Sequence, residues 1–351
     1  MADNGGKSGA TRRPTMRDVA ARAGVSLKTV SRVVNQEPVV EQGTVTKVET
    51  AIDELRYRRD SLARNLRKGI RQHSIGLIIE DLANPFYAYL AQAVEDVADL
   101  NDHSLILTSS REDPERERKF VLNLLQRGVE GLLIVPAGHD HRYLSADLAR
   151  GVRVVFLDRT PGGVDADVIL SENRAGARRA VEHLIAHGHR RIAFVGDPIA
   201  LETSADLYLG YRDALEAAGI ALDEQLVVAS SHTVESAEAA TCALITLVQP
   251  PTAIFAQNNR NCVGALRALQ AMGATMAVVG FDDFELATLL PVPVTVVAND
   301  PHEMGRQGAE LLFQRLAGLE GPPIHKFIPS RLIERGTGEI TPAAVHVGAT
   351  A

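Results

Sequence analysis

MRDVAARAGVSLKTVSRVVN, residues 16–35, predicts two short helices joined by a tight turn. Thr15, followed three residues later by Asp18, is typical of the position just before a helix begins. Gly24 can end that helix by adopting a left-handed backbone conformation, and Ser26 can cap the next helix. A short, glycine-bearing turn between two helices is the arrangement that a helix-turn-helix requires.

A third helix over about residues 44–56 would complete a small all-α headpiece, which we assign to residues 15–59. All three helices offer one apolar side, because small hydrophobic residues recur at helical spacing. The members of this predicted core are Val19, Ala20, Ala23, Val30, Val33, Val34, Val48, Ile52 and Leu55.

The outward face of the second predicted helix is suited to DNA. Lys28 and Arg32 are one helical turn apart, so both can enter a major groove and donate to guanine O6 and N7. Leu27 can contact a thymine methyl group. The alternative is a surface helix with ordinary charges. Short polar residues that fit phosphate contacts accompany these side chains: Thr29, Ser31 and Asn35.

Charge is distributed unevenly along the chain, whose formal net charge is −7. Residues 1–71 carry 15 Lys and Arg against 8 Asp and Glu, whereas residues 72–351 carry 22 against 36. A basic head on an acidic body indicates that the head binds a polyanion, although a solvated basic face would have the same charge.

The hydrophobic pattern of the sequence changes from His73 onward. Short apolar runs such as 74–79 and 277–279 alternate with amphipathic stretches such as 86–100 and 304–316. This alternation is typical of parallel sheets with crossover helices. The units are too many for one comfortable sheet, so we expect two α/β lobes.

The sequence shows no targeting or membrane segment. Residues 1–14, which we expect to form a disordered arm, lack the apolar region of a secretory signal. No run of 18 apolar residues is present. We therefore expect a cytoplasmic protein with no membrane partner, in which Cys242 and Cys262 stay reduced.

Sequence motifs of catalysis are missing as well. There is no phosphate-binding glycine loop with Lys-Ser/Thr and no Gly-x-Ser-x-Gly elbow. His183 and His187 could hold zinc, but no third ligand follows at a suitable spacing. Asp282 and Asp283 are adjacent at a strand end and point in different directions, which disfavours an acid–base dyad. We predict no enzyme, no catalytic residue, no cofactor and no metal.

Residues 16–35 resemble the headpiece of the lactose repressor/galactose repressor (LacI/GalR) family of transcription regulators. The resemblance covers nearly the whole chain. Further similar segments are 51–57 and 63–66 (third helix and hinge), 75–79 with 84–87 (first sensor strand and helix), 183–196 (start of the second lobe) and 279–283 (a ligand-contacting strand end).

The resemblance implies that the headpiece reads duplex DNA. In the family, a short helix after the position of Tyr57 folds on DNA, and a leucine matching Leu66 wedges into the minor groove. Residues 60–71 would form this hinge, although Asp60, where asparagine is common, would be repelled by phosphates. The implied DNA-binding residues are Thr15, Ser26, Leu27, Lys28, Thr29, Ser31, Arg32, Asn35, Thr44, Tyr57, Ala63 and Leu66.

The resemblance also implies a periplasmic-binding-protein-like sensor over residues 72–340. We expect a homodimeric repressor that binds a palindromic double-stranded DNA operator, with an affinity that a small-molecule effector controls. The helix near 86–100 is expected in the dimer surface, and no heptad pattern predicts a tetramerising coiled coil. The expected boundaries are about 72–171 and 300–328 for lobe 1, about 172–299 and 329–340 for lobe 2, and 341–351 for a tail.

Effectors of such sensors are expected beyond the carboxyl ends of the strands. Leu207 stands where the family usually has an effector-contacting arginine, and His232 stands where an aromatic residue often stacks. Asn259 replaces a common aspartate. Because the donor fork of arginine is missing, we expect an effector less polar than an ordinary or phosphorylated sugar, or a degenerate site. The predicted effector-binding residues are Phe86, Tyr87, Asp158, Leu207, His232, Asn258 and Asp282.

Two other classes of protein share a body of this kind. A solute-binding protein of a transporter would have the same two lobes, but it would lack a helix-turn-helix and would carry a signal peptide. An enzyme of the doubly wound α/β class would need a reactive constellation of side chains, which the sequence does not contain.

Overall fold

The computed structural model describes residues 15–34, 40–55 and 73–342. The chain divides into two compact units, Met1–Gln72 and His73–Ala351, and each is considered by itself. The expected arm over residues 1–14, the hinge over residues 60–71 and most of the tail lie outside the described residues.

The head consists of α1 (Met16–Ala23), α2 (Leu27–Val34) and α3 (Gln42–Glu54). The Asp18 carboxylate accepts hydrogen bonds from the Thr15 amide (2.6 Å) and hydroxyl (2.7 Å), which fixes the start of α1. Gly24 follows α1 in a left-handed conformation with φ of 67°. The predicted turn chemistry is therefore confirmed.

The third helix begins two residues earlier than the predicted Thr44 and also ends earlier, at Glu54. The Glu41 carbonyl accepts from the amides of Thr44 and Val45, which places Thr44 inside the first turn of α3. An exposed helix start offers no apolar periodicity to reveal it. The three helices enclose a small core whose buried members are Val19, Ala20, Val30, Val48 and Ala51.

The first sheet of the second unit is wholly parallel. The strand that begins at Ser74 pairs with a neighbour on each side, and its Ile75 lies opposite Leu105 and Gly131. The strands, in spatial order, are β11 (His325–Ile328), β5 (Asp167–Ser171), β4 (Arg153–Leu157), β3 (Gly131–Ile134), β1 (Ser74–Ile79) and β2 (Ser104–Ser109).

The second sheet repeats this order, except that its edge strand is antiparallel to its neighbour. The strands, in spatial order, are β12 (Arg331–Ile333), β10 (Thr295–Ala298), β9 (Ala277–Phe281), β8 (Ala253–Ala256), β6 (Ile192–Gly196) and β7 (Val227–Ala229). The two-lobed α/β prediction is confirmed, with β12 as its one antiparallel strand in the described part of the chain.

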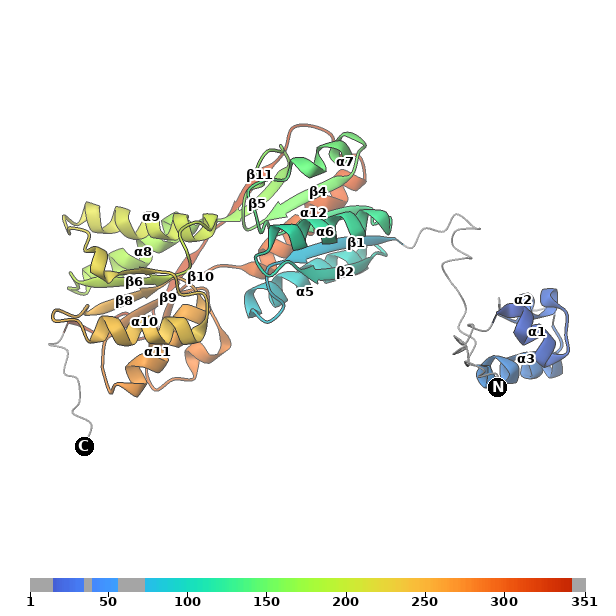
Figure 1. Cartoon of the computed structure of the whole chain (residues 1–351), viewed down its shortest axis with the longest axis horizontal. Coiled ribbons are helices and arrows are strands. Elements are labelled where there is room, and N and C mark those ends of the chain that lie inside the picture. Colours follow the sequence, from blue (N-terminus) through green and yellow to red (C-terminus); the bar gives the residue numbers. More distant parts are fainter. Residues whose placement is uncertain (1–14, 35–39, 56–72, 343–351) are drawn as a thin grey trace, which may run out of the picture. The chain divides into compact units, whose positions relative to one another are not determined.

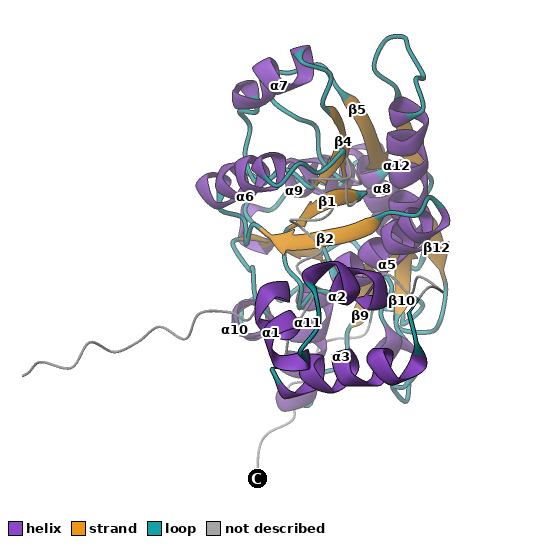
Figure 2. Ribbon diagram, turned by 90° about the vertical axis from the view of Figure 1, so that its right-hand side faces the viewer, coloured by secondary structure: helices purple, strands orange, loops and turns teal. Residues whose placement is uncertain are grey.

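Helices cover both faces of each sheet. In Figure 2, α6 lies on one side of β1 and β2, while α5 and α12 lie on the other. In lobe 2, α8 and α9 cover one face and α10 and α11 the other. The helices are α5 (Pro85–Leu100), α6 (Pro114–Gln126), α7 (Ser145–Ala149), α8 (Asn173–Ala186), α9 (Glu202–Ala217), α10 (Val234–Ile245), α11 (Asn259–Ala271) and α12 (Pro301–Leu316).

Three connections join the lobes, as Figure 1 shows. They follow β5, β10 and β11, so α12 and β11 return to the first sheet before β12 completes the second. All three pass on the side where the parallel strands end, which brings two sets of strand ends together. None of the described helices is long and apolar enough to cross a membrane.

Candidate DNA-binding and effector sites

α2 presents the side chains that the sequence assigns to base contacts. Leu27 is 45% exposed although it is apolar, and Lys28 beside it is exposed. Ser26 caps the helix, because its hydroxyl accepts from the Thr29 amide at 3.1 Å and also bonds the Thr29 hydroxyl at 2.8 Å. The cap orients the first turn of α2, from which Lys28 projects.

The remaining predicted DNA-binding residues are placed differently. Ser31 and Arg32 on α2 are partly buried, Thr15 caps α1, and Thr44 lies at the start of α3. Val30 of α2 is fully buried in the head core, so its side of the helix faces inward. Four of the predicted residues lie outside the described part of the chain: Asn35, Tyr57, Ala63 and Leu66.

Asp158 and Asp282 occupy equivalent positions in the two lobes, directly after β4 and β9. Both have left-handed backbones, with φ of 67° and 65°. Each amide donates to a carbonyl of the next strand, that of Ile169 or Val297. A positive φ is uncommon for a residue with a side chain and tends to occur at functional sites. The two strand ends therefore form a matched pair of carboxyl-bearing turns.

A buried ion-pair network stands beside Asp158. The Arg159 guanidinium bonds Glu112 at 2.6 and 2.8 Å and Glu80 at 3.2 Å. The Tyr87 hydroxyl donates to Glu80 at 2.9 Å and to Asp158 at 3.4 Å. Burial and the Glu112 charge raise the pKa of Glu80. Most of the positive charge of Arg159 is already engaged by these carboxylates.

The facing edge of lobe 2 carries Asp197, which follows β6. Its carboxylate accepts from the Asn258 side-chain amide at 2.9 Å and bonds His232 Nδ1 at 3.2 Å. The hydrogen bond to Asp197 raises the pKa of His232 above its usual value. Asn258 also caps α11 through the Asn261 amide at 2.9 Å. His232 and Asn258, both predicted effector residues, therefore meet at one carboxylate.

The Asp282 carboxyl accepts a hydrogen bond from the side-chain amide of Asn299 at 3.1 Å. Burial, with smaller contributions from the Asp158 and Asp197 charges, raises the pKa of Asp282 to about 7. The strands of both sheets end on the side where the lobes are connected, so the polar strand ends of the two lobes face one region, which we call the interlobe cleft.

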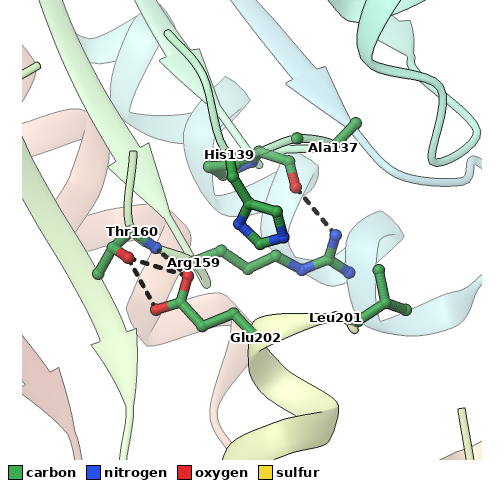
Figure 3. A pocket seen from close by; sticks show the side chains of 8 residues that line it. Ala137, His139, Arg159, Thr160, Leu201 and Glu202 are labelled. Carbon is green, nitrogen blue, oxygen red and sulfur yellow. Dashed lines mark hydrogen bonds between the residues drawn. The ribbon is translucent and has the colours of Figure 1, made fainter. Parts of the chain in front are cut away.

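A pocket at the junction of the lobes lies next to this cleft and is drawn in Figure 3. Thr160 of lobe 1 donates from its amide and hydroxyl to Glu202 of lobe 2 at 2.9 Å. His139 Nε2 lies 3.3 Å from the Ala200 carbonyl. The pocket has room for only about one water molecule, which is too little for an effector. The hydrogen bonds of Thr160 and His139 therefore serve to join the lobes.

Two predicted effector residues are aromatic side chains at the start of α5. Phe86 and Tyr87 are buried and pack edge to face, with ring centroids 5.1 Å apart. Leu207 lies in the apolar core of lobe 2 with Phe194 and Tyr211. The residue at the position usually held by arginine therefore fills core space, with no polar atom to offer a ligand.

Comparison with known proteins identifies the family. Residues 15–60 match bacterial regulatory proteins of the lacI family, and residues 181–337 match a periplasmic binding protein-like domain. The ribose operon repressor of Halalkalibacterium halodurans is 32% identical over 330 residues, which are 92% of this chain and 96% of that protein. That of Escherichia coli is 34% identical over 309 residues, 86% of this chain and 93% of that protein.

The chain belongs to the LacI family of bacterial regulatory proteins.

Solved structures agree with this assignment. The Lac repressor bound to ONPG in the repressed state is 30% identical, with a TM-score of 0.72, and the match covers 93% of this chain and 100% of that chain. A complex of the transcriptional regulator CelR with cellobiose is 32% identical, with a TM-score of 0.68 and the same coverage.

This LacI-family chain is thus a DNA-binding transcription regulator and not an enzyme. The function predicted from residues 16–35 is confirmed, and the solute-binding alternative is wrong because the lacI headpiece precedes the binding-protein-like domain. The sequence reasoning missed Glu80, Glu112 and Arg159 in the cleft. A signal for two of them was present, because Glu80 directly follows β1 and Arg159 follows Asp158.

Proposed function

We propose that this LacI-family regulator binds a palindromic operator as a homodimer, and that a neutral, polyhydroxylated small molecule in the interlobe cleft changes its affinity. The observation that supports the proposal is the set of carboxyl groups at strand ends of both lobes, Asp158 after β4, Asp197 after β6 and Asp282 after β9. The side chains of α2 would make the base contacts that recognise the operator.

Carboxyl groups in the cleft favour a ligand that donates hydrogen bonds. Sugar hydroxyls donate to carboxylate oxygens, whereas a phosphate would meet repulsion. Arg159 is bonded to Glu80 and Glu112, so it offers an anion little uncompensated charge. The carboxyl groups therefore favour a sugar over the less polar effector that Leu207 suggested. Similar proteins include ribose operon repressors and a cellobiose complex.

The proposed dimer surface follows from exposed apolar residues after β9. Leu286 is 58% exposed, Leu289 74% and Val292 46%. Glu285, next to them, accepts a 2.9 Å hydrogen bond from Tyr89 of α5. The apolar patch is therefore continuous with the helix that the sequence assigns to the dimer surface. A contiguous exposed patch of this kind is typical of an association surface.

The DNA-binding proposal is tested with Lys28→Ala in a binding-site selection followed by fluorescence anisotropy. The loss of one base contact should relax preference at one symmetric pair of operator positions and weaken specific binding by about 1–3 kcal/mol per contact. Lys47→Ala, at an exposed site on α3, is the matched control. An unchanged site profile for Lys28→Ala would show that Lys28 does not read bases.

The effector proposal is tested by the melting temperature of the full chain with ribose, cellobiose or ribose 5-phosphate. A neutral sugar that binds only the folded protein should raise the melting temperature, and Asp282→Ala should remove that rise. A shift with the phosphorylated sugar alone would contradict the proposed ligand class. The DNA-binding test does not depend on this result.

A further inference from the structure

Three side chains far apart in sequence meet at the edge of the first sheet that is opposite the cleft. His73 precedes β1, His103 precedes β2 and Glu130 precedes β3. Sheet order places β1 between β2 and β3. The Ser104 amide donates to the His73 carbonyl at 3.0 Å and the Glu130 amide to the Ser74 carbonyl at 2.8 Å, so the three strand starts are held together.

The ligand atoms of these side chains all lie within 4.8 Å of one another. His73 Nδ1 is 2.6 Å from Glu130 Oε1, and His103 Nε2 is 3.2 Å from Glu130 Oε2. A tetrahedral zinc ion with bonds of about 2.0–2.2 Å needs ligand atoms roughly 3.4 Å apart. The His73 side chain is 55% exposed, so it is free to move its Nδ1 to the separation of about 3.4 Å that zinc needs.

The orientation of the His103 ring supplies an independent argument. Its Nδ1 lies 2.6 Å from the Asn101 carbonyl, which can only accept, so Nδ1 carries the proton. Nε2 then faces the Glu130 carboxylate at 3.2 Å, where either a proton or a metal ion can lie between the two atoms. A histidine whose second nitrogen is fixed by a backbone carbonyl is also the usual form of a metal ligand.

Packing fixes this ring in place. His103 is 12% exposed and packs edge to face on Phe313 of α12, with ring centroids 4.9 Å apart. Only His73 among the three ligands is largely exposed. A rigid pair of ligands with one adjustable partner reduces the ordering that metal binding requires.

We propose that His73, His103 and Glu130 form a binding site for one divalent transition-metal ion of the zinc class, with water completing the coordination. Two imidazoles and one carboxylate are ligands that zinc accepts, whereas calcium and magnesium prefer oxygen alone. His73 is the first residue of the second unit, so the ion would tie the start of β1 to the starts of β2 and β3. This site does not depend on the proposed effector.

The experiment uses the full, tag-free chain after treatment with a chelator. Zn²⁺ is titrated in competition with a chromophoric chelator, and Co²⁺ absorption reports the geometry of the bound ion. We expect one ion per chain. Loss of one ligand in His73→Ala or His103→Ala should weaken binding by at least about tenfold.

Two control variants make the test specific. His302→Ala removes an exposed histidine on α12, and His187→Ala removes one of the rival pair formed with His183, whose rings are 4.4 Å apart. Both should keep wild-type affinity. The proposal is overturned if His73→Ala, at an exposed position that leaves the fold intact, binds Zn²⁺ as the wild type does, or if only His187→Ala loses the ion.

Discussion

The residues that matter most in the cleft are polar groups placed in strained or buried positions. Asp158 and Asp282 hold left-handed backbones at matched strand ends, and Arg159 is buried among carboxylates. Removal of one member of such a network leaves an uncompensated charge. We therefore expect substitutions in this network to lower stability as well as to alter the proposed sensor site.

Asp282→Asn tests the raised pKa of Asp282 through the pH dependence of stability. The folded-state pKa of about 7 lies above the ordinary 3.8, so between these values the folded chain holds a proton that the unfolded chain has released. Asp282 therefore destabilises the fold increasingly as pH rises toward 7. Asparagine keeps the acceptor for Asn299 and tolerates a positive φ.

Urea unfolding at pH 5 and pH 8 measures this effect. The free energy of unfolding of Asp282→Asn minus that of the wild type should increase by on the order of 2 kcal/mol between pH 5 and pH 8. Asp99→Asn, on the exposed face of α5, should show no such gain. A difference that is the same at both pH values would mean that Asp282 is ionised normally in the fold.

At the scale of elements, capping residues decide where helices begin. Asn84, Asp113 and Asp300 each accept from amides of the following turn, and each precedes a proline at the first helical position. Proline fits there because that position needs no amide hydrogen. The sequence prediction began the first of these helices one residue late and the last three residues late, because apolar periodicity appears only after the cap.

Gly24 and Gly43 provide a matched test of the head. Neither has any atom within 4 Å of an added Cβ, but Gly24 has φ of 67° whereas Gly43 lies inside α3. Gly24→Ala should lower the stability of the head by about 1–2 kcal/mol. Gly43→Ala should raise it by about 0.5–1 kcal/mol.

Thermal unfolding of the full chain, followed by circular dichroism with the head transition resolved, compares the two variants. Equal effects of the two substitutions would show that the left-handed turn between α1 and α2 does not limit the stability of the head. Reduced operator binding by Gly24→Ala alone would connect that turn to the placement of α2.

At the scale of the whole molecule, association is expected to depend on the patch around Leu289. Leu289→Asp would place a charge in the proposed dimer surface and should shift the chain toward monomers. Val248→Asp, at a fully exposed position after α10, is the control and should leave the dimer intact. Size-exclusion chromatography with light scattering measures the mass. A dimeric Leu289→Asp variant would place the interface elsewhere.

The sequence by itself determined the head, the alternation of strands and helices, and the family, because these depend on local spacing, caps and turn residues. Asp158 and Asp282 could be predicted from their places after apolar runs. Leu207 could not be placed in the core, since only packing shows which side of α9 it occupies.

Only the tertiary structure decided which distant residues meet. β5, β10, β11 and β12 are three to five residues long, and their pairing, such as His325 opposite Val168, depends on partners far along the chain. The same is true of Arg159 with Glu80 and of His73 with His103 and Glu130. A sheet brings together strand ends that no local pattern connects, because strand order and not sequence distance sets which side chains are neighbours.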